Sequence, residues 1–162
     1  MFQQSADVDL CPYSPDYDQE LNDFYLPEDQ LQFTAYPKEM IEMACKDASR
    51  NPVVILSEGK PIGFFVLQSG ERVKNYTDKN HCLLLIAFSI DTKYQGKGFA
   101  KLALEQLSDY VNVHFPDVQE IVLAVNERNR AAQKLYLKCG FEDHGVRRMG
   151  KIGMQLVLTC SV

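Results

Sequence analysis

The feature that most restricts the fold is a nine-residue apolar run that leads into a turn with two glycines. Residues 82–90 read CLLLIAFSI, a composition typical of a strand buried on both faces. Apolar residues recur at helical spacing over 98–114 and again over 128–139, so two helices are available to cover such a strand. We therefore predict an α/β fold, in which helices cover both faces of a central mixed β-sheet.

The remaining segments add further strands and one more helix. Pro37 begins a predicted helix over 37–45, and Asn51-Pro52 breaks it. Residues 11–30 are predicted to be irregular or partly helical. The predicted strands are 53–56 and 62–67, which form a hairpin, then 82–90, 121–125, 141–146 and 151–158, with the last two joined by a turn near Met149-Gly150.

Length and charge limit the class of protein. The 162 residues suit one domain, 1–162, and no apolar run reaches the roughly 18 residues of a transmembrane helix. The first ten residues lack the basic start and apolar core of a signal peptide, so we expect a cytoplasmic location and no membrane partner. A nucleic-acid partner is not expected, because the formal net charge is −5.

The five cysteines are not spaced for a disulfide framework or a zinc site. Their number is odd, and no pair has C-x-x-C spacing. We interpret each as a small buried apolar residue, and we expect no bound metal. The cysteines are Cys11, Cys45, Cys82, Cys139 and Cys160.

The turn after the apolar run has the composition of an anion site. Gly96 and Gly98 leave backbone N–H groups uncovered at the start of a helix, and Lys97 and Lys101 add positive charge. The spacing fits neither the Walker pattern of ATP-binding proteins nor the dinucleotide fingerprint G-x-G-x-x-G. Judged on glycine content alone, a turn that only starts a helix is an equal alternative.

Two motifs together resemble one enzyme family. QGKGFA, residues 95–100, resembles the Q/R-x-x-G-x-G/A signature of the GNAT family of N-acetyltransferases. NRAAQKLYLKCGFE, residues 129–142, resembles that family's N-x-x-A-x-x-x-Y-x-K-x-G-F-x segment. The resemblance covers residues 53–158, which it identifies as an acetyl-CoA-binding core. Residues 1–50 match only loosely, as the variable substrate-side segment of the family does.

The resemblance implies acetyl-CoA as co-substrate and a role for each matching residue. Backbone groups of Phe88, Ser89 and Ile90 would pair with the pantetheine arm as if it were an added strand. Asn129 would reach the cofactor from the other side, and Tyr136 stands where the family often places its general acid. The residues expected to cradle the diphosphate are Gln95, Gly96, Lys97, Gly98, Phe99, Ala100 and Lys101.

Acetyl transfer to an amine explains why such groups are needed. An amine with a pKa of about 10.4 is almost fully protonated at pH 7, so a base or a water chain must remove a proton before attack. A strand N–H within 88–90 could stabilise the oxyanion, and a tyrosine could protonate the departing thiolate. Direct transfer forms no covalent enzyme intermediate, so it requires no cysteine nucleophile.

The general base is not identified by the motifs. Many members of the family carry a glutamate on the strand before the turn, and residues 82–90 contain no carboxylate. Glu28, Asp91, His81 and a water held by the backbone remain alternatives. Tyr136 also has a purely structural interpretation, since it lies on the core-facing side of its helix.

Other polar residues have structural interpretations that we favour over functional ones. His114 suits the last turn of its helix, where a histidine complements the helix dipole. His144, Arg147 and Arg148 could touch the cofactor's 3′-phosphate or a substrate, but a solvated turn accounts for them. The acidic, tyrosine-rich run could line a site for a cationic amine or form a plain exposed segment; it contains Tyr13, Asp16, Tyr17, Asp18, Glu20, Asp23 and Tyr25.

The function predicted from the sequence is that of an acyltransferase of class EC 2.3.1.-. It would transfer the acetyl group of acetyl-CoA to a primary amine of a small molecule, with a polyamine as one option, or of a peptide. The alternative is a non-catalytic acyl-CoA-binding sensor or interaction module, and the motifs do not separate acetyl from longer acyl donors. The oligomeric state stays open, with a homodimer as the commonest assembly.

Overall fold

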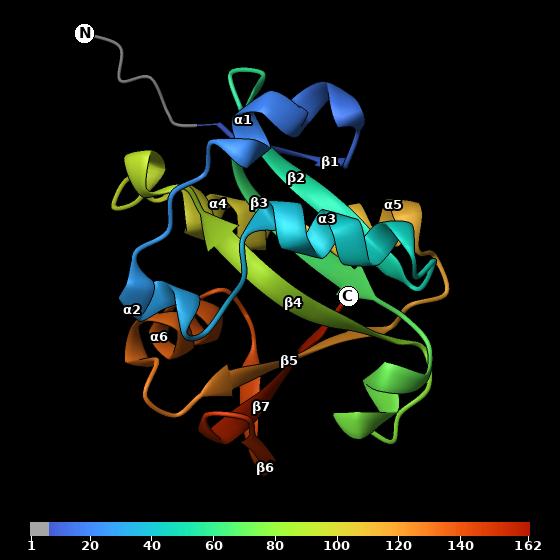
Figure 1. Ribbon diagram of the computed structural model, residues 1–162. Coiled ribbons are helices and arrows are strands. Elements are labelled where there is room, and N and C mark those ends of the chain that lie inside the picture. Colours follow the sequence, from blue (N-terminus) through green and yellow to red (C-terminus); the bar gives the residue numbers. More distant parts are fainter. Residues whose placement is uncertain (1–6) are drawn as a thin grey trace, which may run out of the picture.

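The computed structural model describes residues 7–162, which form a seven-stranded sheet in the order β1-β2-β3-β4-β5-β7-β6 (Figure 1). All neighbouring strands are antiparallel except β4 and β5. The strands are β1 (Asp9–Pro12), β2 (Arg50–Ser57), β3 (Lys60–Gln68), β4 (Cys82–Ile90), β5 (Glu120–Asn126), β6 (Glu142–Gly150) and β7 (Gly153–Ser161). The α-helices are α1 (Asp18–Asn22), α2 (Glu28–Leu31), α3 (Pro37–Cys45), α4 (Phe99–Glu105), α5 (Leu107–His114) and α6 (Arg130–Lys138).

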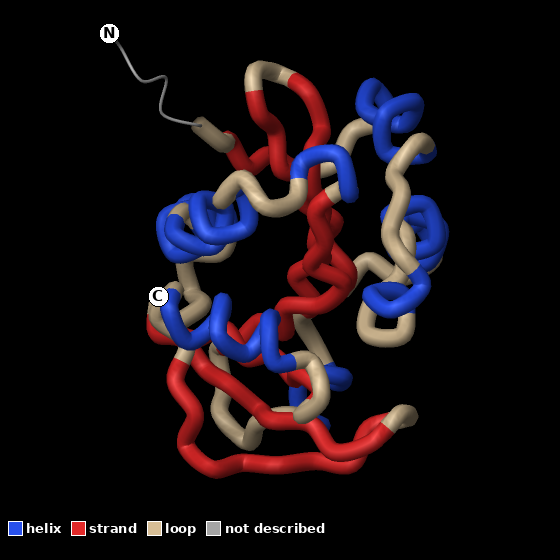
Figure 2. The backbone as a smooth tube through the Cα atoms, turned by 90° about the vertical axis from the view of Figure 1, so that its left-hand side faces the viewer, coloured by secondary structure: helices blue, strands red, loops and turns tan. Residues whose placement is uncertain are grey.

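Helices cover both faces of the sheet, as predicted (Figure 2). Alternate residues of β3 contribute to different cores: Phe64 and Val66 pack with α1 and α3, and Phe65 and Leu67 pack with α4 and α5. Each fully buried side chain of this size contributes about 1.5–3 kcal/mol through removal of apolar surface from water. The helix residues in these cores are Leu21 and Met40 on one face, and Leu104, Leu107 and Val111 on the other.

The parallel pair β4–β5 separates after a short stretch. The two strands pair only over residues 82–84 and 120–122. From Leu85 to Ile90, the edge of β4 that faces β5 has no strand partner among the described residues, whereas its other edge pairs with β3. A β-bulge lies in this part of β4, where Ala87 has a φ of 57°. The sheet therefore opens between β4 and β5, beside the glycine turn.

Several boundaries differ from the prediction. The helix predicted over 98–114 is two helices, because Gln106 bonds back to Ala103 and donates its side-chain amide to the carbonyl of Val8 (2.7 Å). Strand β1 was not predicted; it is four residues long and is held by pairing with β2. The final turn lies at 151–152 rather than near 149–150, since β6 continues to Gly150.

No helix within residues 7–162 is both long enough and apolar enough to cross a membrane.

Candidate active site

The glycine turn joins β4 to α4 and has an open outer side. A short 3-10 turn, Thr92–Tyr94, follows β4, with Tyr94 N bonded to Asp91 O (2.8 Å) and Gln95 N to Thr92 O (3.2 Å). Gly96 and Gly98 then have φ values of 76° and 84°, the left-handed region that side chains disfavour. A Cβ atom at either glycine would meet nothing within 4 Å, so the space in front of the turn is free of protein atoms.

The backbone N–H groups of this turn are available to a ligand. Within residues 7–162, no N–H group from Gly96 to Lys101 donates to a protein acceptor, and the first helical bond is Leu102 N to Gly98 O (3.2 Å). A row of unpaired N–H groups at a helix start favours an anion. Lys97 lies nearby with its Nζ 5.9 Å from the centre of the Tyr94 ring, and Lys101 faces Glu105 at 3.8 Å.

A cavity of about 160 Å³ lies between the turn, the end of β4 and α6. Its walls combine backbone of the turn with apolar side chains from three elements. The lining residues are Ile90, Tyr94, Gln95, Gly96, Gly98, Phe99, Ala100, Lys101 and Leu135.

Gln95 holds the turn from inside. Its Nε2 donates to Ile90 O (2.7 Å) and to Gln30 Oε1 (2.9 Å), while its Oε1 accepts from Gln30 Nε2 (3.0 Å). Since both polar ends of its side chain contact protein, Gln95 shapes the turn, and the outward N–H groups come from the residues that follow it.

The end of β4 carries the three residues expected along the pantetheine arm. Ser89 and Ile90 are buried and Phe88 is partly buried. The Phe88 ring stacks on Phe65 with 5.8 Å between ring centres. The buried hydroxyl of Ser89 finds no hydrogen-bond partner in the described part of the chain. These residues lie on the stretch of β4 whose edge is open.

Tyr136 projects from α6 toward this opening. Its ring packs edge-on against Phe88 at 6.3 Å and against Phe141 at 5.6 Å between centres. Although the residue as a whole is partly exposed, desolvation raises the pKa of its hydroxyl far above the usual value for tyrosine. No side chain or carbonyl of residues 7–162 forms a hydrogen bond with that hydroxyl in the structure. The group is therefore a protonated phenol beside the open strand.

Asn129 begins α6 and serves as its N-cap. Its Oδ1 accepts from Ala132 N (3.3 Å), and its N–H donates to Asn126 O (2.9 Å). Gln133 supports the same loop, since its Nε2 lies 2.9 Å from the carbonyls of both Asn126 and Glu127. The oxygen of Asn129 is thus used within the protein, and only its amide N–H2 is left to face a ligand.

The three candidate bases occupy different places. Asp91 is 2% exposed, accepts from Tyr25 N (3.4 Å) and pairs with Lys93 (3.7 Å), so its carboxylate serves the structure. Glu28 is exposed at the start of α2, the helix whose Gln30 contacts the glycine turn.

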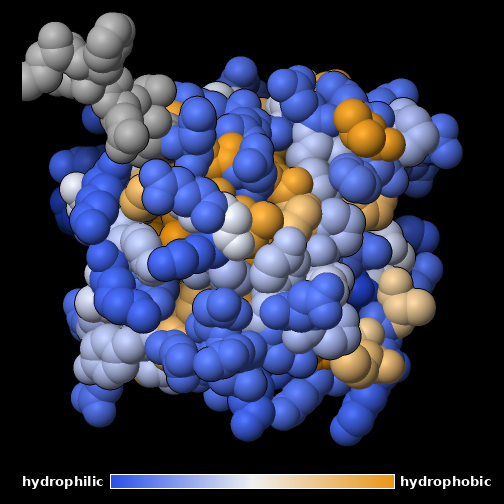
Figure 3. Space-filling view, turned by 90° about the horizontal axis from the view of Figure 1, so that it is seen from above, coloured by the Kyte–Doolittle hydropathy of each residue, from blue (hydrophilic) through white to orange (hydrophobic). Residues whose placement is uncertain are grey.

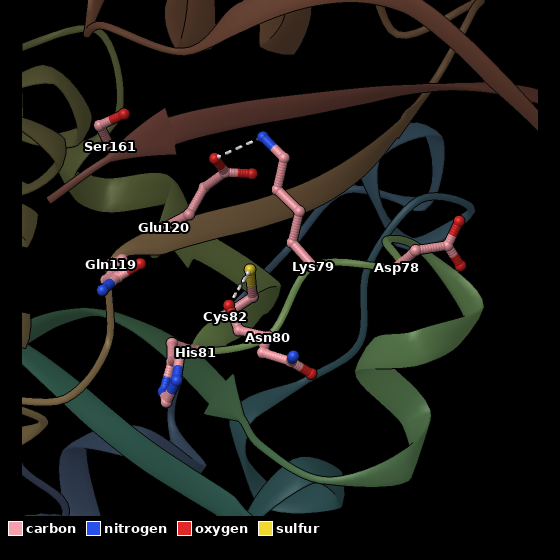
Figure 4. A pocket seen from close by; sticks show the side chains of 8 residues that line it. All are labelled: Asp78, Lys79, Asn80, His81, Cys82, Gln119, Glu120 and Ser161. Carbon is pink, nitrogen blue, oxygen red and sulfur yellow. Dashed lines mark hydrogen bonds and ion pairs between the residues drawn. The ribbon is translucent and has the colours of Figure 1, made fainter.

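His81 is excluded as the base by its position. It precedes β4, whereas the turn follows β4, and nine strand residues span about 30 Å. It lines a separate pocket of about 520 Å³, where Lys79 pairs with Glu120 (3.2 Å). Figure 4 shows the side chains of this pocket. The other lining residues of that pocket are Asp78, Asn80, Cys82, Gln119 and Ser161.

The remaining polar candidates have structural partners. His114 stacks on Tyr110 with 4.1 Å between ring centres, and His144 lies 3.4 Å from Glu142. Arg147 binds Asp143 through two nitrogens (2.8 and 3.0 Å) and lowers the pKa of that carboxyl. Arg148 donates to Gln155 Oε1 (2.7 Å), and its guanidinium lies 4.2 Å from the centre of the Tyr76 ring.

The acidic, tyrosine-rich run includes η1 (Pro15–Tyr17) and α1, and a side-chain hydrogen bond holds part of it in place. The Tyr13 hydroxyl donates to Asp18, and burial together with this carboxylate raises the pKa of Tyr13 to about 12. Tyr25, in contrast, is 60% exposed. Figure 3 shows the end of the molecule near α1, where hydrophilic side chains dominate and apolar atoms are visible between them.

Two contacts of the site were not predicted from the sequence. Gln30 meets Gln95 across 65 positions, and Tyr25 O accepts from Thr92 N (3.0 Å). No motif in the N-terminal segment indicates either contact.

Among the described residues, no three His, Cys, Asp or Glu side chains come together in a way that could hold a metal ion.

Comparison with known proteins gives a consistent result. A family model described as the acetyltransferase (GNAT) family matches residues 15–141. The uncharacterized N-acetyltransferase YbbJ of Bacillus subtilis is 42% identical over 155 residues, which are 95% of this chain and 97% of that protein. Spermine/spermidine N(1)-acetyltransferase of the same organism is 29% identical over 123 residues, 76% of this chain and 80% of the relative.

Solved structures share the fold at low sequence identity. The aminoglycoside acetyltransferase AAC(6')-Ib, in complex with coenzyme A and kanamycin, has a TM-score of 0.74 and 19% identity, over 96% of this chain and 95% of that one. A GNAT family acetyltransferase from Elizabethkingia anophelis with acetyl-CoA bound has a TM-score of 0.61 and 15% identity, over 96% and 98% of the two chains.

Proposed function

The chain belongs to the acetyltransferase (GNAT) family, and we propose that it transfers the acetyl group of acetyl-CoA to a primary amine of a small molecule or peptide. One observation carries the proposal: the outward N–H groups of residues 96–101 stand directly beside the open edge of β4. The N–H groups suit a diphosphate, and the open strand edge suits an extended chain with amide groups. Coenzyme A contains a diphosphate and such a chain.

The seating of the co-substrate follows from these two features. The diphosphate would accept from the N–H groups of Gly96 to Lys101, with Lys97 adding charge at the rim. The pantetheine arm would pair with the backbone of Phe88, Ser89 and Ile90, along the edge that β5 leaves open. The thioester would then lie between β4 and Tyr136, whose ring contacts Phe88.

The proposed transfer is a direct displacement, in which each proton that one group releases is taken up by another. The neutral amine nitrogen attacks the thioester carbonyl carbon, and a backbone N–H of β4 stabilises the oxyanion. The C–S bond then breaks, and the thiolate takes the proton of the Tyr136 hydroxyl. The proton lost by the amine leaves through a base or a water, which returns one to the tyrosine. Glu28 is the exposed candidate base on α2, the helix whose Gln30 contacts the glycine turn.

The acceptor is proposed to enter from the N-terminal side, with residues 1–50 as the acceptor-side segment and 53–158 as the cofactor core. The segment reaches both sides of the site, because Gln30 contacts Gln95 and the Arg128 guanidinium lies 6.0 Å from the centre of the Phe33 ring. A polycationic amine is favoured by the net charge of −5 and by relatives named for spermine, spermidine and aminoglycosides. The predicted cytoplasmic location and homodimer stay proposals.

The proposal is tested with a panel of amines and acetyl-CoA, with detection of the free thiol. The panel contains spermidine, spermine, an aminoglycoside, amino acids and peptides with a free N-terminus. We expect turnover on at least one amine, fastest with a polycation, and none with the N-acetylated form of the same compound. Tight binding of acetyl-CoA without turnover on any amine would contradict the enzyme and favour a non-catalytic acyl-CoA-binding module.

A further inference from the structure

The glycine turn is held by a residue that lies outside both sequence motifs. The side-chain amides of Gln30 in α2 and Gln95 in the turn bond to each other reciprocally, at 2.9 and 3.0 Å. Gln95 also donates to Ile90 O at 2.7 Å. Both residues are partly buried, so water competes less for these bonds than at the open surface.

The orientation of this amide pair is determined by the backbone. The carbonyl of Ile90 can only accept, so the nitrogen of Gln95 must face it. The Oε1 atom of Gln95 then faces Gln30. Gln30 can bond to both ends of the Gln95 amide only if its Nε2 donates to Gln95 Oε1 and its Oε1 accepts from Gln95 Nε2. The chain of contacts thus runs in one defined arrangement from α2 to the end of β4.

A second connection joins the same two segments. Thr92 N donates to Tyr25 O (3.0 Å), and Tyr25 N donates to the buried carboxylate of Asp91 (3.4 Å). Residues 25–30 are therefore fastened to the turn at its beginning, through Asp91 and Thr92, and near its glycines, through Gln95. The N-terminal segment and the turn are parts of one hydrogen-bonded unit.

We propose that Gln30 is a positioning residue for the diphosphate turn, which acts through Gln95 and couples the N-terminal segment to coenzyme A binding. The inference rests on the proposed function, because the turn it concerns is the one assigned to the diphosphate. A turn held in its binding conformation loses less entropy when the ligand binds. Coupling between two sites is reciprocal, so coenzyme A bound at the turn also stabilises residues 25–31.

Methionine substitutions test the pair, because methionine keeps the length of glutamine and removes both amide atoms. Calorimetric titration with coenzyme A is made on the wild type, Gln30→Met, Gln95→Met and the double variant. Gln32→Met is the matched control: Gln32 is exposed at the end of the same helix and donates to Asp29 O, away from the turn. Gln30→Met removes two hydrogen bonds of ordinary strength, so we expect its dissociation constant for coenzyme A to be about tenfold higher than that of the wild type.

The double variant separates positioning from a general structural effect. If Gln30 acts through Gln95, then Gln30→Met adds nothing in the Gln95→Met background. Wild-type affinity in Gln30→Met, or effects of the two substitutions that simply add, would overturn the inference.

A second readout needs no ligand and therefore separates this inference from the proposed function. Hydrogen exchange at the bonded amides of Tyr94 and Gln95 reports how often the turn opens. We expect both amides to exchange about tenfold faster in Gln30→Met and at the wild-type rate in Gln32→Met. Unchanged exchange in Gln30→Met refutes the positioning role. A wild type that fails to bind coenzyme A, in contrast, refutes the proposed function and leaves the exchange result to decide the role of Gln30.

Discussion

Tyr136→Phe is expected to lower kcat at least about a hundredfold while the affinity for coenzyme A changes less than about twofold. Loss of a positioned general acid has an effect of this size. The ring contacts with Phe88 and Phe141 survive the substitution, and the hydroxyl has no hydrogen bond with residues 7–162 to lose. Stability at neutral pH should therefore be unchanged. Steady-state kinetics with saturating amine, together with coenzyme A titration, separate the two quantities.

Tyr110→Phe is the matched control for this substitution. Tyr110 is buried, burial raises its pKa to about 12, and it stacks on His114 in α5. We expect wild-type kcat for it. A Tyr136→Phe enzyme that turns over at the wild-type rate would show that Tyr136 only packs.

The pH dependence gives the acid role a further signature. Because burial raises the pKa of Tyr136 above the ordinary tyrosine value of about 10, its hydroxyl stays protonated from pH 7 to about pH 9. The ratio of the wild-type kcat to the kcat of Tyr136→Phe should then be constant over this pH interval. Deprotonation of the amine acceptor increases the rate of both enzymes with pH. If the two enzymes had equal kcat values by pH 9, a buried phenol could not be the general acid.

Gly96→Val is expected to weaken coenzyme A binding at least about thirtyfold. At a φ of 76° a β-branched residue is strained, so the free turn relaxes from this conformation, and restoring it on binding at a cost of about 2 kcal/mol corresponds to that factor. The new side chain also extends into the free space in front of the turn, where the diphosphate is proposed to bind. Calorimetry with coenzyme A measures the loss directly.

Gly59→Val provides the control for backbone strain. Gly59 lies in the β2–β3 turn with the same φ of 76° and with the same open surroundings. Both variants should lose similar stability in denaturant unfolding, but only Gly96→Val should lose affinity. Equal affinity in the two variants would show that the turn does not hold the ligand.

Sequence patterns predicted the elements whose own residues determine them. The run 82–90 is a strand over the same residues, and the helix that follows Pro37 ends at Cys45 as expected. In both cases a strong period or a clear start signal lies within the segment itself. The positive φ values at Gly96 and Gly98 agree with the reason given for glycine there.

Features set by distant partners could not be predicted in this way. Gln106 interrupts a helix because its side chain meets Val8, 98 positions away, and β1 exists only through its pairing with β2. The inward direction of the Gln95 side chain depends on Gln30, for which no local pattern exists. His81 is different, since the length of the predicted strand already placed it about 30 Å from the turn.

A crystal structure of the protein with acetyl-CoA tests the central claim most directly. The account predicts diphosphate oxygens within hydrogen-bond distance of N–H groups in residues 96–101, and the pantetheine arm along β4 from Phe88 to Ile90. It also predicts the thioester sulfur near the Tyr136 hydroxyl. Acetyl-CoA bound at another surface, with the glycine turn empty, would contradict the account.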